Sequence, residues 1–174
     1  MRCFLAIDLP EEVKEELLRI EREIQPFLVG NFVESKNMHL TLKFLGEIDE
    51  AKLKDIRKKL KKIKLKKFKA GLGKFGFFSP SFIRVVWISV EPKEIIKGLY
   101  EEIEKALGNK PAGFESHVAL VRVKKIDDKR SFLSKTLRIK IKTKGFEVKE
   151  FVLKKSTLTP NGPIYEDLEE FELN

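Results

Sequence analysis

The sequence predicts an α+β fold in which two pseudo-symmetric lobes, each an antiparallel-rich sheet with outer helices, form a central cleft. Three observations support this prediction. A strand–helix–strand order occurs twice, each expected helix carries one apolar stripe, and several strand-like segments lie outside the two repeats. Because 174 residues suffice for one sizeable core, residues 1–174 are predicted to form a single domain of two duplicated lobes.

The first half of the chain supplies the first repeat. Residues 2–8, with the apolar run "CFLAI", predict a strand, and 9–24 predict a helix with Pro10 in its first turn. Residues 37–46 predict a second strand, and 50–63 a second helix. The apolar stripes of these two helices are Val13, Leu17, Ile20 and Ile24, then Leu53, Ile56, Leu60 and Ile63.

The second half repeats the order. Residues 82–90 predict a strand, 91–107 a helix, 116–123 a strand and 128–137 a short helix. The stripe of the long helix is Ile95, Leu99, Ile103 and Leu107, which places Val13 opposite Ile95 at an offset of 82. The remaining strand candidates are 67–75, 138–146, 148–156 and 165–173.

Composition narrows the function classes. The formal charge of +9 favours a polyanionic partner such as nucleic acid, and residues 52–69 alone hold eleven lysines or arginines against one acid. A solvated helix face explains that stretch equally well. A single cysteine, Cys3, argues against a disulfide framework, and no segment is apolar enough for a membrane helix. We therefore expect a cytoplasmic protein, and the abundant Lys and Glu with only one glutamine are typical of a thermophile.

The two histidines of the chain stand in matching settings, "HLTL" at 39–42 and "HVAL" at 117–120. Side chains alternate along a strand, so His39, Thr41 and Lys43 are expected on one face. The second strand should likewise present His117, Ala119 and Val121 together. Two related strands would then each present one imidazole to the cleft.

A pair of imidazoles suits phosphoryl chemistry. In an in-line displacement, one ring can take a proton from water while the other protonates the departing oxygen. The ordinary histidine pKa of about 6.5 permits both roles near neutral pH. Thr41 could donate a hydrogen bond to phosphate, whereas Ala119 cannot. Two alternatives are structural histidines and a metal site, although a third metal ligand at a recognisable spacing is missing.

The ordered motifs resemble a known family. "MRCFLAIDLP", "HLTLKFLGEI", "GLGKFGFFSPSFIRVVWISV", "SHVALVRV" and "STLTPNGPIYE" together resemble the RNA 2′,3′-cyclic phosphodiesterases, once named 2′-5′ RNA ligases, of the 2H phosphoesterase superfamily. The likeness runs nearly end to end. It implies hydrolysis of a terminal 2′,3′-cyclic phosphate to a 2′-phosphomonoester, with no cofactor and no metal. Some members also join tRNA halves reversibly.

The resemblance also implies residue roles. His39 would be the proton donor and His117 the proton acceptor, while Thr41, Arg122 and Phe44 would bind substrate. Ala119 departs from the usual Thr or Ser of the second motif.

Three of the site residues remain open from the sequence. Alternation places Arg122 on the opposite face from His117 unless a bulge intervenes. Phe44 is otherwise a core residue. Lys43 is added as a substrate-binding candidate from its parity alone, since it could also be a surface residue.

The expected partners are RNA with 2′,3′-cyclic phosphate ends, tRNA halves among them, bound by a monomer without membrane contact. Two other functions stay open at this point. One is a non-catalytic RNA-end-binding module, which the missing hydroxyl at Ala119 favours. The other is a phosphodiesterase acting on small cyclic phosphates.

Overall fold

The computed structural model describes residues 1–79 and 81–174; Pro80, within the quoted segment 71–90, lies outside the described residues. Its elements are, in chain order, β1 Arg2–Asp8, α1 Glu11–Ile24, η1 Gln25–Phe27, β2 Val29–Phe32, η2 Ser35–Asn37, β3 His39–Glu47, α2 Glu50–Leu60, β4 Phe68–Phe77, β5 Val85–Glu91, α3 Lys93–Ala106, β6 His117–Lys125, α4 Lys129–Arg138, β7 Phe146–Val148, β8 Glu150–Thr159 and β9 Gly162–Glu172.

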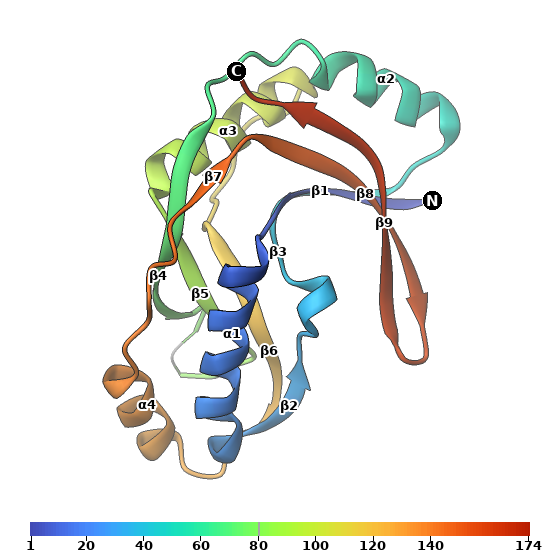
Figure 1. The fold of residues 1–174 in the computed structure, drawn as a ribbon. Helices are drawn as coiled ribbons and strands as arrows, with labels where there is room; N and C mark the ends of the chain where they lie inside the picture. Colours follow the sequence, from blue (N-terminus) through green and yellow to red (C-terminus); the bar gives the residue numbers. More distant parts are fainter. Residues whose placement is uncertain (80) are drawn as a thin grey trace.

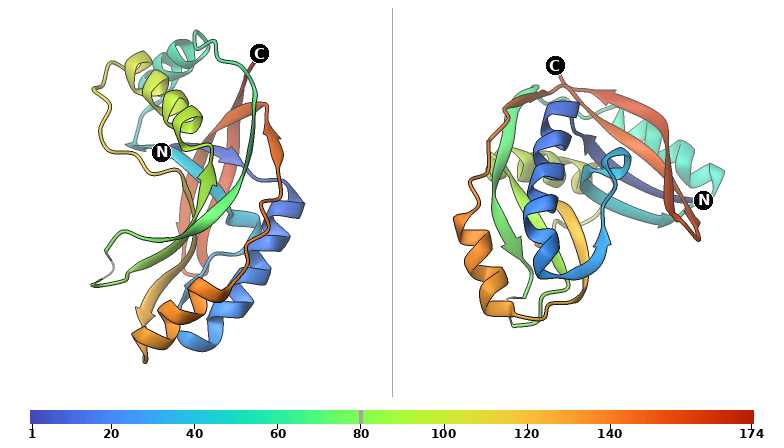
Figure 2. Two further views of the ribbon diagram at one scale, coloured as in Figure 1. Left: turned by 90° about the vertical axis from the view of Figure 1, so that its left-hand side faces the viewer. Right: turned by 60° about the horizontal axis from the view of Figure 1, so that its bottom comes forward.

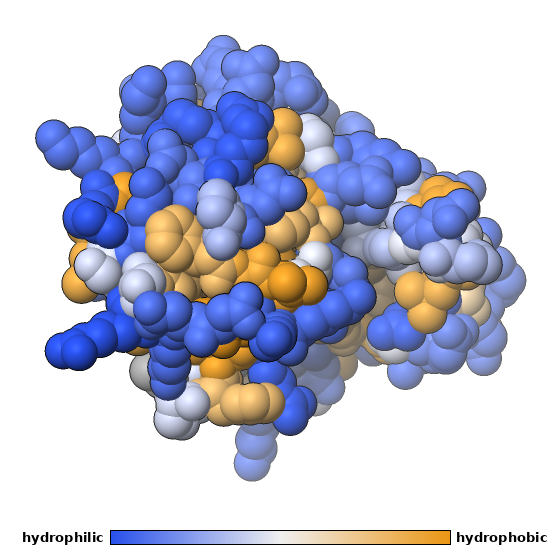
Figure 3. Space-filling model, turned by 90° about the horizontal axis from the view of Figure 1, so that it is seen from below, coloured by the Kyte–Doolittle hydropathy of each residue, from blue (hydrophilic) through white to orange (hydrophobic). Residues whose placement is uncertain are grey.

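Two antiparallel sheets form the fold, which confirms the predicted α+β class. One sheet has four strands in the order β3-β1-β8-β9, and the other has five in the order β2-β6-β5-β4-β7 (Figure 1). The strands β3 and β6 belong to different sheets but contact each other. Seen from below, the surface is hollowed between a larger part on the left and a smaller part on the right (Figure 3).

The helices lie in two pairs at opposite ends of the molecule, α2 with α3 and α1 with α4 (Figure 2). Each long helix reaches the sheet of the other lobe. α1 follows β1 in the chain but contacts β6, and α3 follows β5 but reaches β3 through the ion pair of Glu104 with Lys43. Buried residues from both lobes form one core cluster.

The predicted stripe of the second long helix needs a correction. Ile95 is 50% exposed, whereas Ile96 is fully buried. The buried positions of α1 recur in α3 with an offset of 83 rather than 82. Because Ile95 and Ile96 are both apolar, spacing alone did not reveal which one faces the core.

One strand prediction is wrong and one strand was missed. Most of residues 138–146 form no strand, because side chains of α1 bind their backbone: Lys142 N donates to Glu16 Oε2 (2.6 Å) and Arg19 donates to the Lys140 carbonyl (2.7 Å). The missed strand is β2, "VGNF", whose glycine and asparagine hide its pairing with β6. No helix within residues 1–79 and 81–174 is long and apolar enough to span a membrane.

The offset of 83 pairs two buried glutamates, Glu21 of α1 and Glu104 of α3. Glu104 Oε1 lies 2.6 Å from Lys43 Nζ. Four residues after His117, the position matching Lys43 holds Val121. Accordingly, Glu21 Oε1 is buried with no hydrogen-bond partner among the described residues, and burial raises the pKa of this carboxyl to about 8, despite the nearby Arg22 charge.

We expect Glu21→Met to stabilise the fold, and more so at alkaline pH. Unfolded glutamate ionises near pH 4.3, so between there and about pH 8 the wild-type protein must bind a proton to fold. The gain should therefore grow across that window, level off above it and reach a few kcal/mol. Guanidinium unfolding at about pH 5 and about pH 9 measures it. The exposed Glu15→Met on the same helix is the matched control. An equal gain at both pH values would argue against a buried, protonated Glu21.

Candidate active site

His39 and His117 each open a strand at the contact between the two sheets. The residues that follow them alternate as predicted, because Leu40 and Leu42 are buried and so are Val118 and Leu120. The imidazoles therefore lie on the face opposite the core. Protonated His117 would repel protonated His39 and so lower its pKa, which places the two rings within electrostatic range of each other.

A β-bulge follows each histidine at the same distance. In the β1–β3 pair, Leu5 faces Lys43 and Ala6 faces Thr41, so Leu42 has no partner. In the β5–β6 pair, Val86 faces Val121 and Trp87 faces Ala119, so Leu120 has no partner. Each bulged residue lies three positions after its histidine. A bulge inserts one residue and thereby reverses the alternation of the side chains that follow.

The bulges determine which face of its strand each of Arg122, Phe44 and Lys43 occupies. Arg122 is exposed and returns to the face of His117, which resolves its conflict with simple alternation. Phe44 returns to the face of His39, where it is 70% exposed and its ring centroid lies 6.2 Å from that of Phe4. Phe44 is therefore no core residue.

The predicted faces of Lys43 and Val121 are wrong for the same reason. Lys43 Nζ lies 2.6 Å from the buried Glu104 carboxylate on α3, and Val121 is fully buried. Both side chains point away from the histidines. Lys43 thus holds the helix to the sheet and leaves the group of substrate-binding candidates.

Both imidazoles are anchored in the same way. His39 Nδ1 lies 2.7 Å from the Asn37 carbonyl oxygen, and His117 Nδ1 lies 2.7 Å from that of Glu115. A carbonyl oxygen only accepts hydrogen bonds, so Nδ1 carries the proton in each neutral ring. In each ring this tautomer places a lone pair on Nε2, the nitrogen that does not face the anchoring carbonyl.

The two Nε2 atoms differ in their surroundings. His39 Nε2 lies 2.9 Å from Thr41 Oγ1, so the hydroxyl donates to it when the ring is neutral. The corresponding residue in the other lobe is Ala119, and His117 Nε2 has no hydrogen-bond partner in the described part of the chain. His117 is therefore the ring whose lone pair is open to a proton from solvent or substrate.

Charged groups next to His39 affect its protonation. Burial lowers the pKa of His39; the hydrogen bond to the Asn37 carbonyl opposes this, the charge of Lys154 adds to it, and Asp8 opposes it. Lys154 Nζ is itself held by Asp8 (2.9 Å) and Asp167 (2.6 Å). Burial lowers the pKa of Lys154, but these two carboxylates outweigh it and raise the pKa overall.

Each imidazole also packs against two aromatic rings. His39 contacts Phe4 and Tyr165, with centroid distances of 5.0 and 5.3 Å. His117 contacts Phe78 and Trp87, at 5.1 and 5.4 Å.

The hydroxyl of Tyr165 is affected by a charge on the other sheet. Burial raises the pKa of its hydroxyl, and the charge of Arg122 opposes that rise. Arg122, on β6 of one sheet, therefore lies within electrostatic range of Tyr165, on β9 of the other.

The residues opposite Thr41 and Ala119 differ in size. Thr41 faces the small Ala6, whereas Ala119 faces Trp87. The six-membered ring of Trp87 lies on Gly76 of β4, where any Cβ would come within 2.1–2.3 Å of it. Trp87 is buried, and its ring also packs beside His117. Position 119 thus has a large ring as its cross-strand neighbour, whereas position 41 has a methyl group.

Sequence reasoning missed several neighbours of the histidines, namely Phe4, Asp8, Phe78 and Lys154. Strand 2–8 is almost wholly apolar, so its pattern does not show which face meets the cleft. Lys154 sits in a strand rich in lysine and leaves no distinct signal.

The fold and the two strand-borne histidines define a phosphoesterase of the two-histidine class. The family model for LigT-like phosphoesterases matches residues 7–87. A Methanocaldococcus jannaschii protein named RNA 2′,3′-cyclic phosphodiesterase is 39% identical over 98% of this chain and 100% of its own. An Archaeoglobus fulgidus protein of the same name is 35% identical over 99% and 100%. This chain belongs to the LigT-like phosphoesterase family.

Solved structures agree with this assignment. The crystal structure of Escherichia coli LigT with 3′-AMP has a TM-score of 0.79 and 27% identity, covering 99% of this chain and 96% of LigT. A Thermus thermophilus protein gives a TM-score of 0.78 at 29% identity, covering 99% of this chain and 97% of its own.

Proposed function

We propose that this protein hydrolyses the terminal 2′,3′-cyclic phosphate of RNA to a 2′-phosphomonoester, with His39 as proton donor and His117 as proton acceptor. The observation that carries the proposal is the matched anchoring of both rings through Nδ1, which leaves two Nε2 atoms for acid–base chemistry. The names of the relatives support the substrate class. We also propose that residues 1–174 act as one domain of two duplicated lobes, since the paired bulges match.

The chemistry follows from the positions of the two rings. His117 Nε2 takes a proton from water, whose oxygen then bonds to phosphorus. The bond from phosphorus to O3′ breaks, and O3′ takes the proton carried by His39 Nε2. The phosphate stays on O2′. In-line attack needs the base and the acid on opposite sides of phosphorus, which two rings from two lobes can provide.

Other residues of the cleft would hold the substrate. Arg122 presents a fixed positive charge and a planar set of donors to the phosphate oxygens. The Thr41 hydroxyl supplies a further donor once it turns from His39 Nε2. Phe44, exposed beside Phe4, offers a ring face on which a base can stack.

The substrates we propose are RNA ends with a cyclic phosphate, tRNA halves included, bound by a monomer in the cytoplasm. In the joining reaction, a 5′-hydroxyl of a second RNA replaces water as the nucleophile, so the same acid–base pair serves. The stretch 52–69 is a weaker candidate for RNA contact than the cleft. Two of its cations, Arg57 on α2 and Lys61 just after that helix, form ion pairs with Glu169 of β9 at 3.0 and 2.7 Å.

The direct test is a short synthetic RNA with a 2′,3′-cyclic phosphate end, incubated with excess EDTA and its products resolved as 2′- or 3′-phosphate. We expect release of the 2′-phosphate at an undiminished rate, because the proposed steps use only side chains of this chain. Among the described residues, no group of three or more His, Cys, Asp and Glu side chains is arranged to hold a metal ion. Loss of activity on chelation, restored by a divalent ion, contradicts the mechanism. Tight binding without turnover favours an RNA-end-binding module instead.

The lowered pKa of His39 predicts a pH dependence. Since the acid must be protonated in the free protein, kcat/KM should fall on the alkaline side with a limb below about pH 6.5. Lys154→Met removes a charge that lowers this pKa and frees Asp8, so the limb should move to higher pH. Profiles of kcat/KM across about pH 4.5–8.5 measure the shift. An alkaline limb at the same pH in both proteins would show that the limb does not report the protonation of His39.

A further inference from the structure

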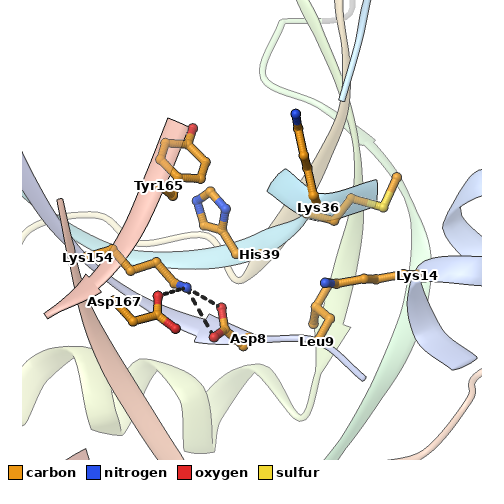
Figure 4. Close-up of a pocket in the computed structure, with 9 residues that line it drawn as sticks. Asp8, Leu9, Lys14, Lys36, His39, Lys154, Tyr165 and Asp167 are labelled. Atoms are coloured by element: carbon orange, nitrogen blue, oxygen red, sulfur yellow. Dashed lines mark hydrogen bonds and ion pairs between the residues drawn. The ribbon is translucent and has the colours of Figure 1, made fainter. Parts of the chain in front are cut away.

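A pocket of about 450 Å³ opens beside His39 in the first lobe (Figure 4). Segments distant in the chain meet there, from β1, α1, β3, β8 and β9. Its lining residues are Asp8, Leu9, Lys14, Lys36, Met38, His39, Lys154, Tyr165 and Asp167. The proposed reaction uses only His39 of this group.

Two of the three lysines that line the pocket are available to bind an anion. Lys154 is bound by both acids of the pocket, at 2.9 Å from Asp8 and 2.6 Å from Asp167, so these carboxylates are already compensated (Figure 4). Among residues 1–79 and 81–174, Lys14 and Lys36 form ion pairs only with exposed acids, at 3.7 Å from Glu11 and 3.2 Å from Glu34. The Lys36 pair is exposed on both sides, and the Lys14 pair is long and its acid is exposed. Such pairs contribute little, so both ammonium groups can turn to an anion.

We propose that this pocket binds a phosphate carried on the 5′ oxygen of the terminal nucleotide. The inference rests on the proposed function, which puts the cyclic phosphate at the two Nε2 atoms. The 5′ oxygen of the same ribose is where the nucleotide carries its next phosphate, and the pocket adjoins the ring that protonates O3′. Lysines recognise phosphate as point charges. The phosphate can be the linkage to the preceding nucleotide of an RNA or a free 5′-monophosphate.

The position of the two lysines favours this pocket over the other basic surfaces. The pocket at the far end of β6 holds Arg84, Lys124, Lys125 and Lys129, but it lies eight residues along the strand from His117. At α2, Arg57 and the following Lys61 bind Glu169 instead. Lys14 and Lys36 share a pocket with a reacting imidazole and so can act on the terminal nucleotide itself.

The test compares three substrates with one terminal base: the nucleoside 2′,3′-cyclic phosphate, the same compound with a 5′-monophosphate, and a dinucleotide ending in the cyclic phosphate. The wild-type protein is compared with Lys14→Met/Lys36→Met and with Lys97→Met/Lys105→Met. The control pair lies on α3 and removes the same net charge. We expect the wild type to prefer a 5′-phosphorylated substrate by about 10- to 100-fold in kcat/KM, the scale of charge-assisted hydrogen bonds.

The pocket variant should lose this preference and the control variant should keep it. A preference confined to the dinucleotide points to RNA, and one confined to the monophosphate points to a small nucleotide; either supports the site. Hydrolysis of all three substrates without preference, or an equal loss in both variants, overturns the inference while the proposed function stands. Absence of hydrolysis from all three overturns the proposed function and this inference with it.

Discussion

We expect the replacement of His39 or His117 with alanine to lower kcat by about 10²- to 10⁴-fold, the usual scale for general acid–base catalysis, while the protein stays folded. Each imidazole is held by one hydrogen bond to a nearby carbonyl and lies on the face opposite the core, so its loss leaves the sheets intact. Single-turnover rates on a cyclic phosphate measure the effect. Unchanged thermal unfolding excludes a general loss of structure.

The roles of the two rings can be separated with a second substrate. In a nucleoside phosphodiester that carries an activated aryl group, the aryl oxide departs without protonation. It should therefore recover most of the activity lost in His39→Ala and little of that lost in His117→Ala. The opposite pattern would exchange donor and acceptor. Wild-type turnover in either alanine variant removes that histidine from the mechanism.

Much of this site was predictable, because each histidine stands in a short segment with a clear strand pattern. Alternation placed His39 and Thr41 together and opposite Leu40 and Leu42, and burial confirms this. Helical spacing identified the core face of α1. Short-range periodicity is a local property, so one sequence is enough to see it.

The bulges were not predictable, because an inserted residue looks like any other in a strand. They move Lys43 to the core side and bring Arg122 and Phe44 to the histidines. The resemblance to the family had named Arg122 and Phe44, whereas parity alone had named Lys43. The shared motif thus carried spatial information that alternation lacks.

Tertiary pairing decided the remaining differences. Glu16 and Arg19 bind the backbone of residues that resembled a strand, across more than one hundred positions of sequence. The partner of Ala119 is Trp87, which no local pattern reveals. Such contacts depend on which strands lie side by side.

The last expected result concerns the unequal motifs. Thr41→Val keeps the shape of the side chain but removes the hydroxyl beside His39 Nε2, so we expect kcat/KM to fall by about 1–3 kcal/mol, or about 5- to 150-fold. Thr41→Ser retains the donor and serves as the control. Ala119→Thr should bring no gain and change turnover by less than about tenfold, because we expect its added atoms to crowd Trp87, the residue opposite position 119.

Steady-state kinetics on one cyclic phosphate decide between the lobes. If phosphate binding has diverged as the register indicates, Thr41 supplies the hydroxyl on one side and Arg122 the charge on the other. Crowding by Trp87 would then be the reason for alanine at position 119. A large gain from Ala119→Thr, together with little loss from Thr41→Val, would reverse the assignment. It would also require Trp87 to move, and a change in indole fluorescence on substitution at position 119 would reveal that movement, since Trp87 is the only tryptophan of the chain.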